Sequence, residues 1–245
     1  MILALLIMFI IVLVFVSKNV VISSRISVLA NNNAIKKPLI DKNEYKVIRL
    51  ENNLDALLIS DKSTSKCGAS ITVNSGSFSD EKSYYGMAHL TEHLIFLGSK
   101  NFSSSSKNNI SLENYTQSHF GSTNAYTQMD YTTYYFELNC NGFSTALDIF
   151  SDMFANPLLS EEYMDKEINA VNSENDKNLN NDGWKLLQLL KSLSSKDKDN
   201  KFNAFSTGNS KSLRVLDKSS LNKIIRQYVN DNYVPENMRL VLYCK

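Results

Sequence analysis

Two of the three histidines in this 245-residue chain lie four positions apart, in the segment GMAHLTEHLIFLGS at residues 86–99. Residues at positions i and i+4 of a helix lie on one face, one turn apart. A helix here would therefore place His89 and His93 side by side, with Glu92 next to them. Because two imidazoles and a carboxylate gain little from burial alone, their types and spacing indicate a metal site or acid–base chemistry.

The three residues form the pattern H-x-x-E-H, which is the inversion of the thermolysin-type zinc helix. Two neutral imidazoles one turn apart can bind a single zinc ion at about 2 Å each. Glu92 lies at the edge of the same face, where it can reach a water molecule without being a metal ligand. A catalytic zinc needs a third protein ligand, and a carboxylate from another element would complete the set. The five-residue pattern also arises by chance on solvated helices. The rest of the sequence therefore has to decide between a metal site and a chance occurrence.

Acidic residues suitable for the third position lie in KEINAVNSENDKN, residues 166–178, which has helical periodicity. Glu167 and Glu174 are seven positions apart and therefore lie two turns apart on one face. An apolar stripe beside them would dock this helix against the histidine helix and direct both carboxylates to the site. On spacing alone other acids, including Asp176, compete for the same role.

The order of the elements predicts the fold class. Strand-like segments occupy 45–61, 69–80, 122–128, 131–139 and the closing MRLVLYCK at 238–245. Helical periodicity begins at residue 143, and Ser160 is the expected N-cap of a long helix. Because strands and helices come in blocks rather than in strict βαβ alternation, we expect an α+β fold with a mainly antiparallel sheet packed by helices.

The composition is that of a globular protein, with 43% hydrophobic and 21% charged residues. The formal net charge of +1 argues against a nucleic-acid partner, because there is no basic excess to bind phosphate. Cys67, Cys140 and Cys244 lack C-x-x-C spacing, which predicts neither a thiolate zinc site nor a dense disulfide scaffold. One pair can bridge in an oxidising compartment and would leave an odd thiol.

The first sixteen residues are all apolar, a run shorter than the roughly 20 residues that cross a membrane comfortably. We expect residues 1–24 to be either a signal peptide or a signal anchor, with possible membrane anchoring through residues 1–22, and residues 25–43 to be a linker. The sequence does not decide between a cleaved signal peptide and an uncleaved anchor. The expected localisation is the secretory pathway, with the protein either secreted or membrane-anchored, and N-x-[ST] acceptors at Asn101, Asn109 and Asn114 agree weakly with it.

Several blocks in order are more specific than any one motif. These blocks are GMAHLTEHLIFLGSKNF, GSTNAYTQMDYTTYYFEL, EINAVNSENDKNLNNDGWKLLQL, FSTGNSKSL and NMRLVLYCK. Together they resemble the inverzincins, the pitrilysin/insulysin or M16-type zinc metallopeptidases, and most closely the N-terminal domain of the insulin-degrading-enzyme branch. The resemblance covers the chain from about residue 45 onward.

The resemblance implies a role for each candidate site residue. It makes His89, His93 and Glu174 the ligands of one Zn²⁺ per chain and Glu92 the general base. It makes Glu167 a supporting acidic group of the catalytic site.

The resemblance also implies that the strand around Asn124, Ala125 and Tyr126 receives a peptide substrate as an added strand, a mode that supplies backbone donors and acceptors at regular intervals. Residues 44–245 would be the N-terminal catalytic domain of an enzyme whose relatives enclose substrate between two halves. We therefore expect a zinc-dependent endopeptidase acting on peptides or small unfolded proteins, with a second family-like chain or domain as a partner. The alternative is a non-catalytic module, a truncated relative that binds peptides or a partner through the same sheet edge.

Overall fold

The computed structural model describes residues 26–103, 110–197 and 200–245, and in these ranges seven strands form one sheet. The strands are β1 (Ser27–Asn31), β2 (Glu44–Arg49), β3 (Asp55–Ser60), β4 (Lys66–Val73), β5 (Ser122–Thr127), β6 (Thr132–Asn139) and β7 (Met238–Cys244). Their order across the sheet is β1-β2-β3-β7-β4-β6-β5. The expected N-terminal signal peptide or anchor lies outside the described residues.

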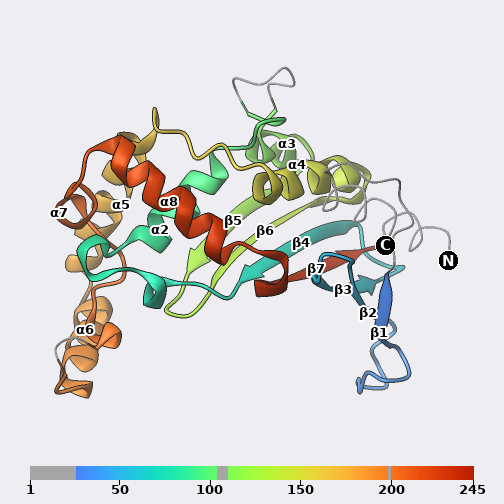
Figure 1. Ribbon diagram of the computed structural model, residues 1–245. Helices are drawn as coiled ribbons and strands as arrows, with labels where there is room; N and C mark the ends of the chain where they lie inside the picture. The colour runs from blue at the N-terminus through green and yellow to red at the C-terminus, as the bar shows by residue number, and fades with distance from the viewer. Residues whose placement is uncertain (1–25, 104–109, 198–199) are drawn as a thin grey trace.

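Among the described residues, seven α-helices lie on one face of this sheet or beyond its end (Figure 1). They are α2 (Met87–Phe96), α3 (Leu112–Ser118), α4 (Phe143–Ala155), α5 (Met164–Leu179), α6 (Asp182–Ser194), α7 (Ser210–Leu213) and α8 (Lys218–Asn232). The helices α3 and α4 lie over the sheet, whereas α5, α6 and α7 lie at the end where β5 is found. The α+β architecture expected from the sequence is confirmed.

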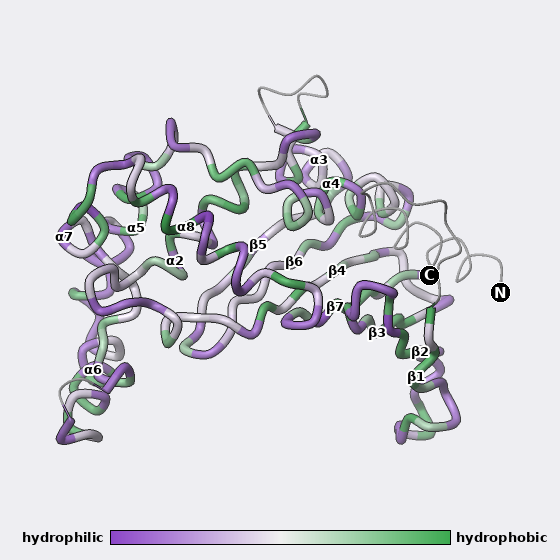
Figure 2. The backbone as a smooth tube through the Cα atoms, viewed as in Figure 1, coloured by the Kyte–Doolittle hydropathy of each residue, from purple (hydrophilic) through white to green (hydrophobic). Residues whose placement is uncertain are grey.

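Alternation along the strands explains why one face is covered. On β4 the side chains of Ala69, Ile71 and Val73 are buried, while the residues between them are partly exposed. Successive strand residues point to opposite faces, so the buried set forms a continuous apolar surface. On that surface the ring of Phe136 from β6 lies 5.1 Å from the ring of Phe150 on α4. Hydropathy also alternates along α8, whose apolar side faces the core (Figure 2).

The sheet is mainly antiparallel, as expected, but β7 pairs in parallel with β3 and antiparallel with β4. The last described strand thus occupies the middle of the sheet. Two local expectations were wrong. The segment 25–43, expected to be an irregular linker, contains β1, which pairs antiparallel with β2. The long helix begins at Met164 rather than after Ser160, and Asp165 and Glu167 are the acids of its first turn.

The start of α2 is fixed by a buried carboxylate that precedes it. Gly86, the N-cap residue, has a φ of 92°, a left-handed conformation that favours glycine. The Asp80 carboxylate accepts hydrogen bonds from the backbone N–H groups of Gly86 and Ala88, at 2.7 and 2.8 Å. Such N–H groups at a helix start have no partner inside the helix. Burial raises the pKa of Asp80 to about 7, and the hydrogen bonds from the backbone oppose this rise.

The Asp80→Ala variant should be less stable than Asp80→Asn by about 1–2 kcal/mol at pH 7, because Ala leaves both N–H groups of α2 without an acceptor. Urea unfolding of both variants measures the difference. The folded-state pKa lies above the ordinary value, so the folded state binds the proton more tightly than the unfolded chain. The unchanged chain should therefore lose stability relative to Asp80→Asn as the pH rises from about 4 to about 7. Equal stability of the two variants, with no such slope, would contradict this assignment.

Candidate metal centre

The helices α2 and α5 pack against each other and carry the four candidate ligand and support residues. His89 and His93 come from α2, and Glu167 and Glu174 come from α5. The two imidazole rings lie 4.9 Å apart, edge to face. Ile168 and Val171, the apolar stripe of α5 in the sequence, are both buried.

The nitrogen and oxygen atoms of this group converge. The distance from Nε2 of His89 to Oε2 of Glu174 is 3.2 Å, and from Nε2 of His93 to Oε1 of Glu174 it is 3.6 Å. One ligand atom from each of the three residues lies within 4.8 Å of the others. The Glu174 side chain is 48% exposed, so the group faces solvent on one side.

The other nitrogen of each imidazole has its own acceptor. Nδ1 of His89 donates to the backbone carbonyl of Thr207 at 2.8 Å, and Nδ1 of His93 donates to Glu167 at 3.1 Å. Because a carbonyl and a carboxylate only accept, each Nδ1 carries a hydrogen, and the Nε2 lone pairs are available for a metal. Two imidazole nitrogens and one carboxylate fit the donor set of a catalytic zinc, which has three protein ligands and one open position.

Glu92 is buried beside this group and accepts a hydrogen bond of 2.5 Å from the Thr127 hydroxyl. Burial raises the pKa of Glu92, and the hydrogen bond from Thr127 opposes the rise. The pKa of Glu174 is lowered by its hydrogen bond with His89. Burial lowers the pKa of His89, but hydrogen bonds to Glu174 and Thr207 outweigh it, so the net shift is upward.

Two residues that support the site were not found from the sequence. Thr127 contacts Glu92, and Thr207 orients His89. The Thr207 carbonyl is held close because Gly208, with a φ of 78°, packs against Gly86. A Cβ on Gly208 would lie 2.6 Å from the Gly86 Cα. Both Thr207 and Gly208 lie in the FSTGNSKSL block. This block contributed to the family resemblance, but no role was predicted for either residue.

Asp176, which competed with Glu174 on spacing alone, is exposed and accepts a hydrogen bond from the Asn172 side chain. It is not one of the three residues whose ligand atoms converge, which are His89, His93 and Glu174.

The converging group lines a cleft of about 690 Å³, which also includes Asn124, Ala125 and Tyr126 of β5. In the described sheet β5 is an end strand, paired with β6 on one side. The N–H of Ala125 bonds to the side-chain oxygen of Asn124 at 2.9 Å rather than to β6, so it points away from the neighbouring strand. Backbone on the outer edge of β5 is therefore close to the converging group. Trp184 of α6 lines the same cleft.

The model of the family described as Insulinase (Peptidase family M16) matches residues 55–197, a range that contains all four residues of the converging helices and Glu92. The chain belongs to the insulinase family. The M16 enzymes are zinc metallopeptidases, which agrees with the donor set described above. The family expected from the sequence is therefore confirmed.

Individual relatives support the same family. The chain is 42% identical over 215 residues to "Insulin-degrading enzyme-like 1, peroxisomal" from Arabidopsis thaliana, with 86% of this chain and 21% of the relative covered. It is 45% identical over 184 residues to the "A-factor-processing enzyme" of Saccharomyces cerevisiae, with 75% and 17% covered. It is 39% identical over 181 residues to the human "Insulin-degrading enzyme", with 74% and 17% covered. The chain thus spans about a fifth of the length of the curated relatives that it matches.

A solved structure has the same fold. The crystal structure of pitrilysin superimposes with a TM-score of 0.80 at 29% identity, and the match covers 89% of this chain and 22% of pitrilysin. The α+β fold of an insulinase-family domain is therefore common to both chains.

The comparisons correct one expectation. The secretory localisation predicted from the apolar N-terminus is contradicted, because a relative that covers most of this chain is named as peroxisomal. Within the described ranges, no helix has both the length and the hydrophobicity required to cross a membrane.

Replacing Thr127 with Val keeps the shape of the side chain but removes the hydroxyl that donates to Glu92. Because that donation favours the carboxylate form, the pKa of Glu92 should rise in the variant. NMR titration of the side-chain carboxyl carbons in the metal-free chain, assigned with Glu92→Gln, measures the change. Thr123→Val, on the same strand, is the matched control and should leave the pKa of Glu92 unaltered. An equal or lower pKa in Thr127→Val would contradict the role of this hydrogen bond.

Proposed function

We propose that this chain provides the catalytic site of a zinc-dependent endopeptidase that hydrolyses peptides or small unfolded proteins. His89, His93 and Glu174 would hold one Zn²⁺. The observation that carries the proposal is that both Nε2 atoms face the Glu174 carboxylate while both Nδ1 atoms are hydrogen-bonded elsewhere. The names of the relatives, which state degradation of insulin and processing of A-factor, agree with such substrates.

A bound zinc ion supplies Lewis acidity, which polarises the scissile carbonyl and acidifies water. Glu92 would take the proton of the attacking water and deliver it to the leaving amine. Burial raises its pKa above the ordinary value of a glutamate, which makes the carboxylate a stronger base. No covalent intermediate with the chain is required.

Glu167 and Thr207 would act through the histidines rather than on the substrate. Glu167 lies against Nδ1 of His93, where it fixes the ring orientation and increases the basicity of Nε2. The Thr207 carbonyl does the same for His89. Glu167 is therefore a positioning residue in this proposal, in agreement with the supporting role that the resemblance implies.

The substrate would bind as an extra strand along the outer edge of β5, next to Glu92. Ala125 offers its N–H on that edge, and Asn124 and Tyr126 flank it within the cleft. Pairing along an end strand gives affinity through backbone hydrogen bonds and depends little on substrate sequence.

Full activity would require a complementary second half or a partner chain. The cleft is open, since Glu174 is about half exposed and Tyr126 is 41% exposed. Exclusion of water strengthens the electrostatic interactions that stabilise a transition state. The same openness favours the alternative function, a non-catalytic module that binds peptides at the β5 edge.

Zinc content and peptide cleavage separate these functions. The unchanged chain should bind about one zinc and cleave an unstructured peptide, and a chelator should stop cleavage. Glu92→Gln should keep the zinc and lose cleavage by about 100-fold or more, whereas Glu174→Gln should lose the zinc. Asp176→Asn is the matched control on the same helix and should retain both. Equal activity in Glu92→Gln would refute its role as base, and zinc binding with peptide binding but no cleavage would favour the non-catalytic module.

Substitution at the strand edge tests the peptide site. Ala125→Pro removes the outward N–H, and proline is tolerated on the free side of an end strand. Loss of one hydrogen bond to the peptide should raise the KM by about three- to tenfold and leave the zinc content unaltered. Ala125→Ser keeps the N–H and is the control. An unchanged KM in the proline variant would exclude backbone pairing at this position.

A further inference from the structure

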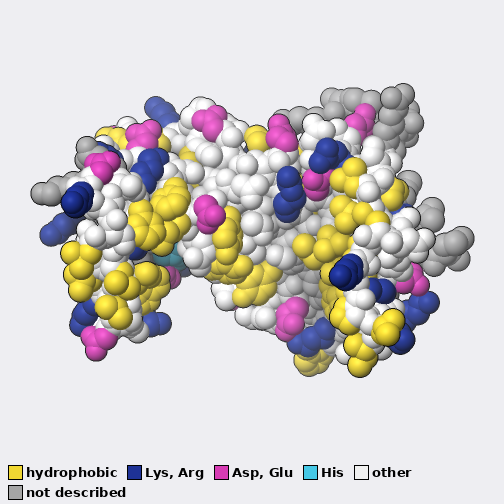
Figure 3. Space-filling model, turned by 90° about the horizontal axis from the view of Figure 1, so that it is seen from below, with side chains coloured by type: hydrophobic (Ala, Val, Ile, Leu, Met, Phe, Trp, Pro, Cys, Tyr) yellow, Lys and Arg dark blue, Asp and Glu magenta, His cyan; other side chains and the backbone are white. Residues whose placement is uncertain are grey.

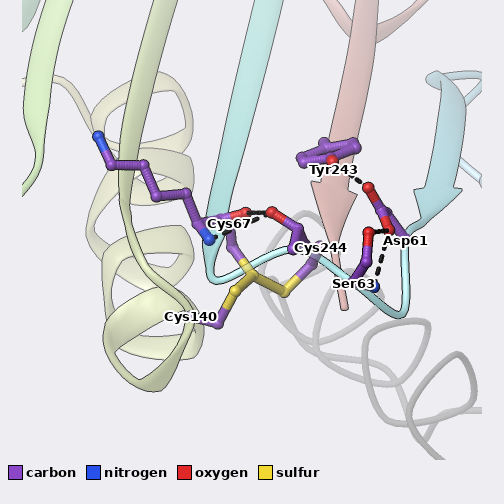
Figure 4. Close-up of a disulfide and its surroundings, with 8 residues drawn as sticks. Asp61, Ser63, Cys67, Cys140, Tyr243 and Cys244 are labelled. Atoms are coloured by element: carbon purple, nitrogen blue, oxygen red, sulfur yellow. Dashed lines mark hydrogen bonds between the residues drawn. A yellow bond between two sulfur atoms is a disulfide. The ribbon is translucent and has the colours of Figure 1, made fainter.

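Three cysteines from distant parts of the sequence meet at one end of the sheet (Figure 4). Cys67 is in β4, Cys140 begins the short 3-10 turn that follows β6, and Cys244 is the last residue of β7. Their separations from Cys67 are 73 and 177 residues, yet the Cα–Cα distances are 4.9 and 4.4 Å. The cluster lies at the end of the molecule remote from α2 and α5 (Figure 1).

The cluster contains one sulfur too many for a disulfide. The Cys67 sulfur lies within bonding reach of both Cys140 and Cys244. Because a cysteine sulfur forms a single disulfide bond, either pairing excludes the other and leaves a third thiol beside it. Cys67 and Cys244 are buried, so that third thiol would be held next to the bond. A ligand that binds all three sulfurs at once would leave no odd thiol.

We propose that the reduced cluster is a second metal site, which binds a thiophilic cation such as Zn²⁺ or Cu⁺ through three thiolates. The sulfur atoms all lie within 4.8 Å of one another. Sulfurs bound to a common zinc at about 2.3 Å are about 4 Å apart, a separation within this limit. The three thiol protons would leave to solvent as the metal–sulfur bonds form.

The donor set determines which cations are accepted. Among the described residues, the grouped ligand atoms here are sulfur alone, whereas the first site offers two imidazoles and a carboxylate. Thiolates select zinc and monovalent copper over the hard cations magnesium and calcium. The two sites therefore differ in chemistry and are separable by experiment. The sequence predicted no thiolate site because the three cysteines have no local spacing pattern.

Metal binding here would join the ends of three strands. A cation that binds only the folded chain stabilises it in proportion to the logarithm of its concentration. Thermal unfolding of the reduced chain should therefore shift to higher temperature on metal addition, even when the first site is disabled.

Cadmium titration tests the proposal. The full chain carries His89→Ala and His93→Ala to remove the first site, and a phosphine keeps the thiols reduced. We expect one Cd²⁺ per chain, a thiolate-to-cadmium charge-transfer band in the ultraviolet, three sulfurs around cadmium by X-ray absorption, and a higher Tm. Cys140→Ser, at the least buried of the three positions, should weaken binding at least tenfold. Ser70→Ala, on β4 away from the cluster, is the control and should bind as before.

Several outcomes would overturn the proposal. These are the absence of the charge-transfer band, two or fewer sulfurs around cadmium, or equal binding by Cys140→Ser. Resistance of a Cys67 disulfide to the phosphine, with no metal bound, would show instead that the cluster is a structural cross-link. The cadmium measurements on the chain that keeps all three cysteines test the proposal even if a serine variant fails to fold.

Discussion

The relative placement of α2 and α5 is the constraint on which the site depends. Both imidazoles come from one helix and both supporting acids from the other, so the group exists only while the two helices keep their register. A shift of one residue along α5 would rotate Glu174 by about 100° around the helix axis and carry its carboxylate away from both Nε2 atoms. The buried Asp80 and the close contact of Gly86 with Gly208 hold the start of α2 in place.

A second dependence joins the converging group to the sheet. Thr127 ends β5, and its hydroxyl bonds directly to Glu92. The same strand presents the outward N–H of Ala125 to the cleft. The group with the raised pKa and the open strand edge are thus held by one short stretch of backbone. A change that displaces β5 would disturb both together.

The apolar side chains gathered on the protruding helix α6 face outward near this end of the molecule (Figure 3).

Although the choice of Glu174 over Asp176 needed the family resemblance, residue types and spacing predicted the helix of His89 and His93, the common face of Glu167 and Glu174, and most strands. These features are local, since each follows from a period of 2 or 3.6 residues. The supports were not predictable. Thr127 and Thr207 act on residues 35 and 118 positions away in the sequence, and Asp80, only six and eight residues from its partners, lies in no periodic pattern. The cysteine cluster and the central position of β7 were not predictable either, because both depend on contacts between segments that are distant in the sequence. The secretory expectation failed because a short apolar run alone does not specify a compartment.

The central place of β7 has a consequence for how the chain acquires its structure. During synthesis β1, β2 and β3 can pair early, and β4, β5 and β6 can form a second unit, but the two remain separate until residue 244 has left the ribosome. The parallel pairing of β3 with β7 joins residues as far apart as Asp55 and Arg239, and such non-local contacts slow folding. Until then two strand edges stay open to other chains. Pairing of β7 with β3 on one side and β4 on the other closes both of these edges with one strand.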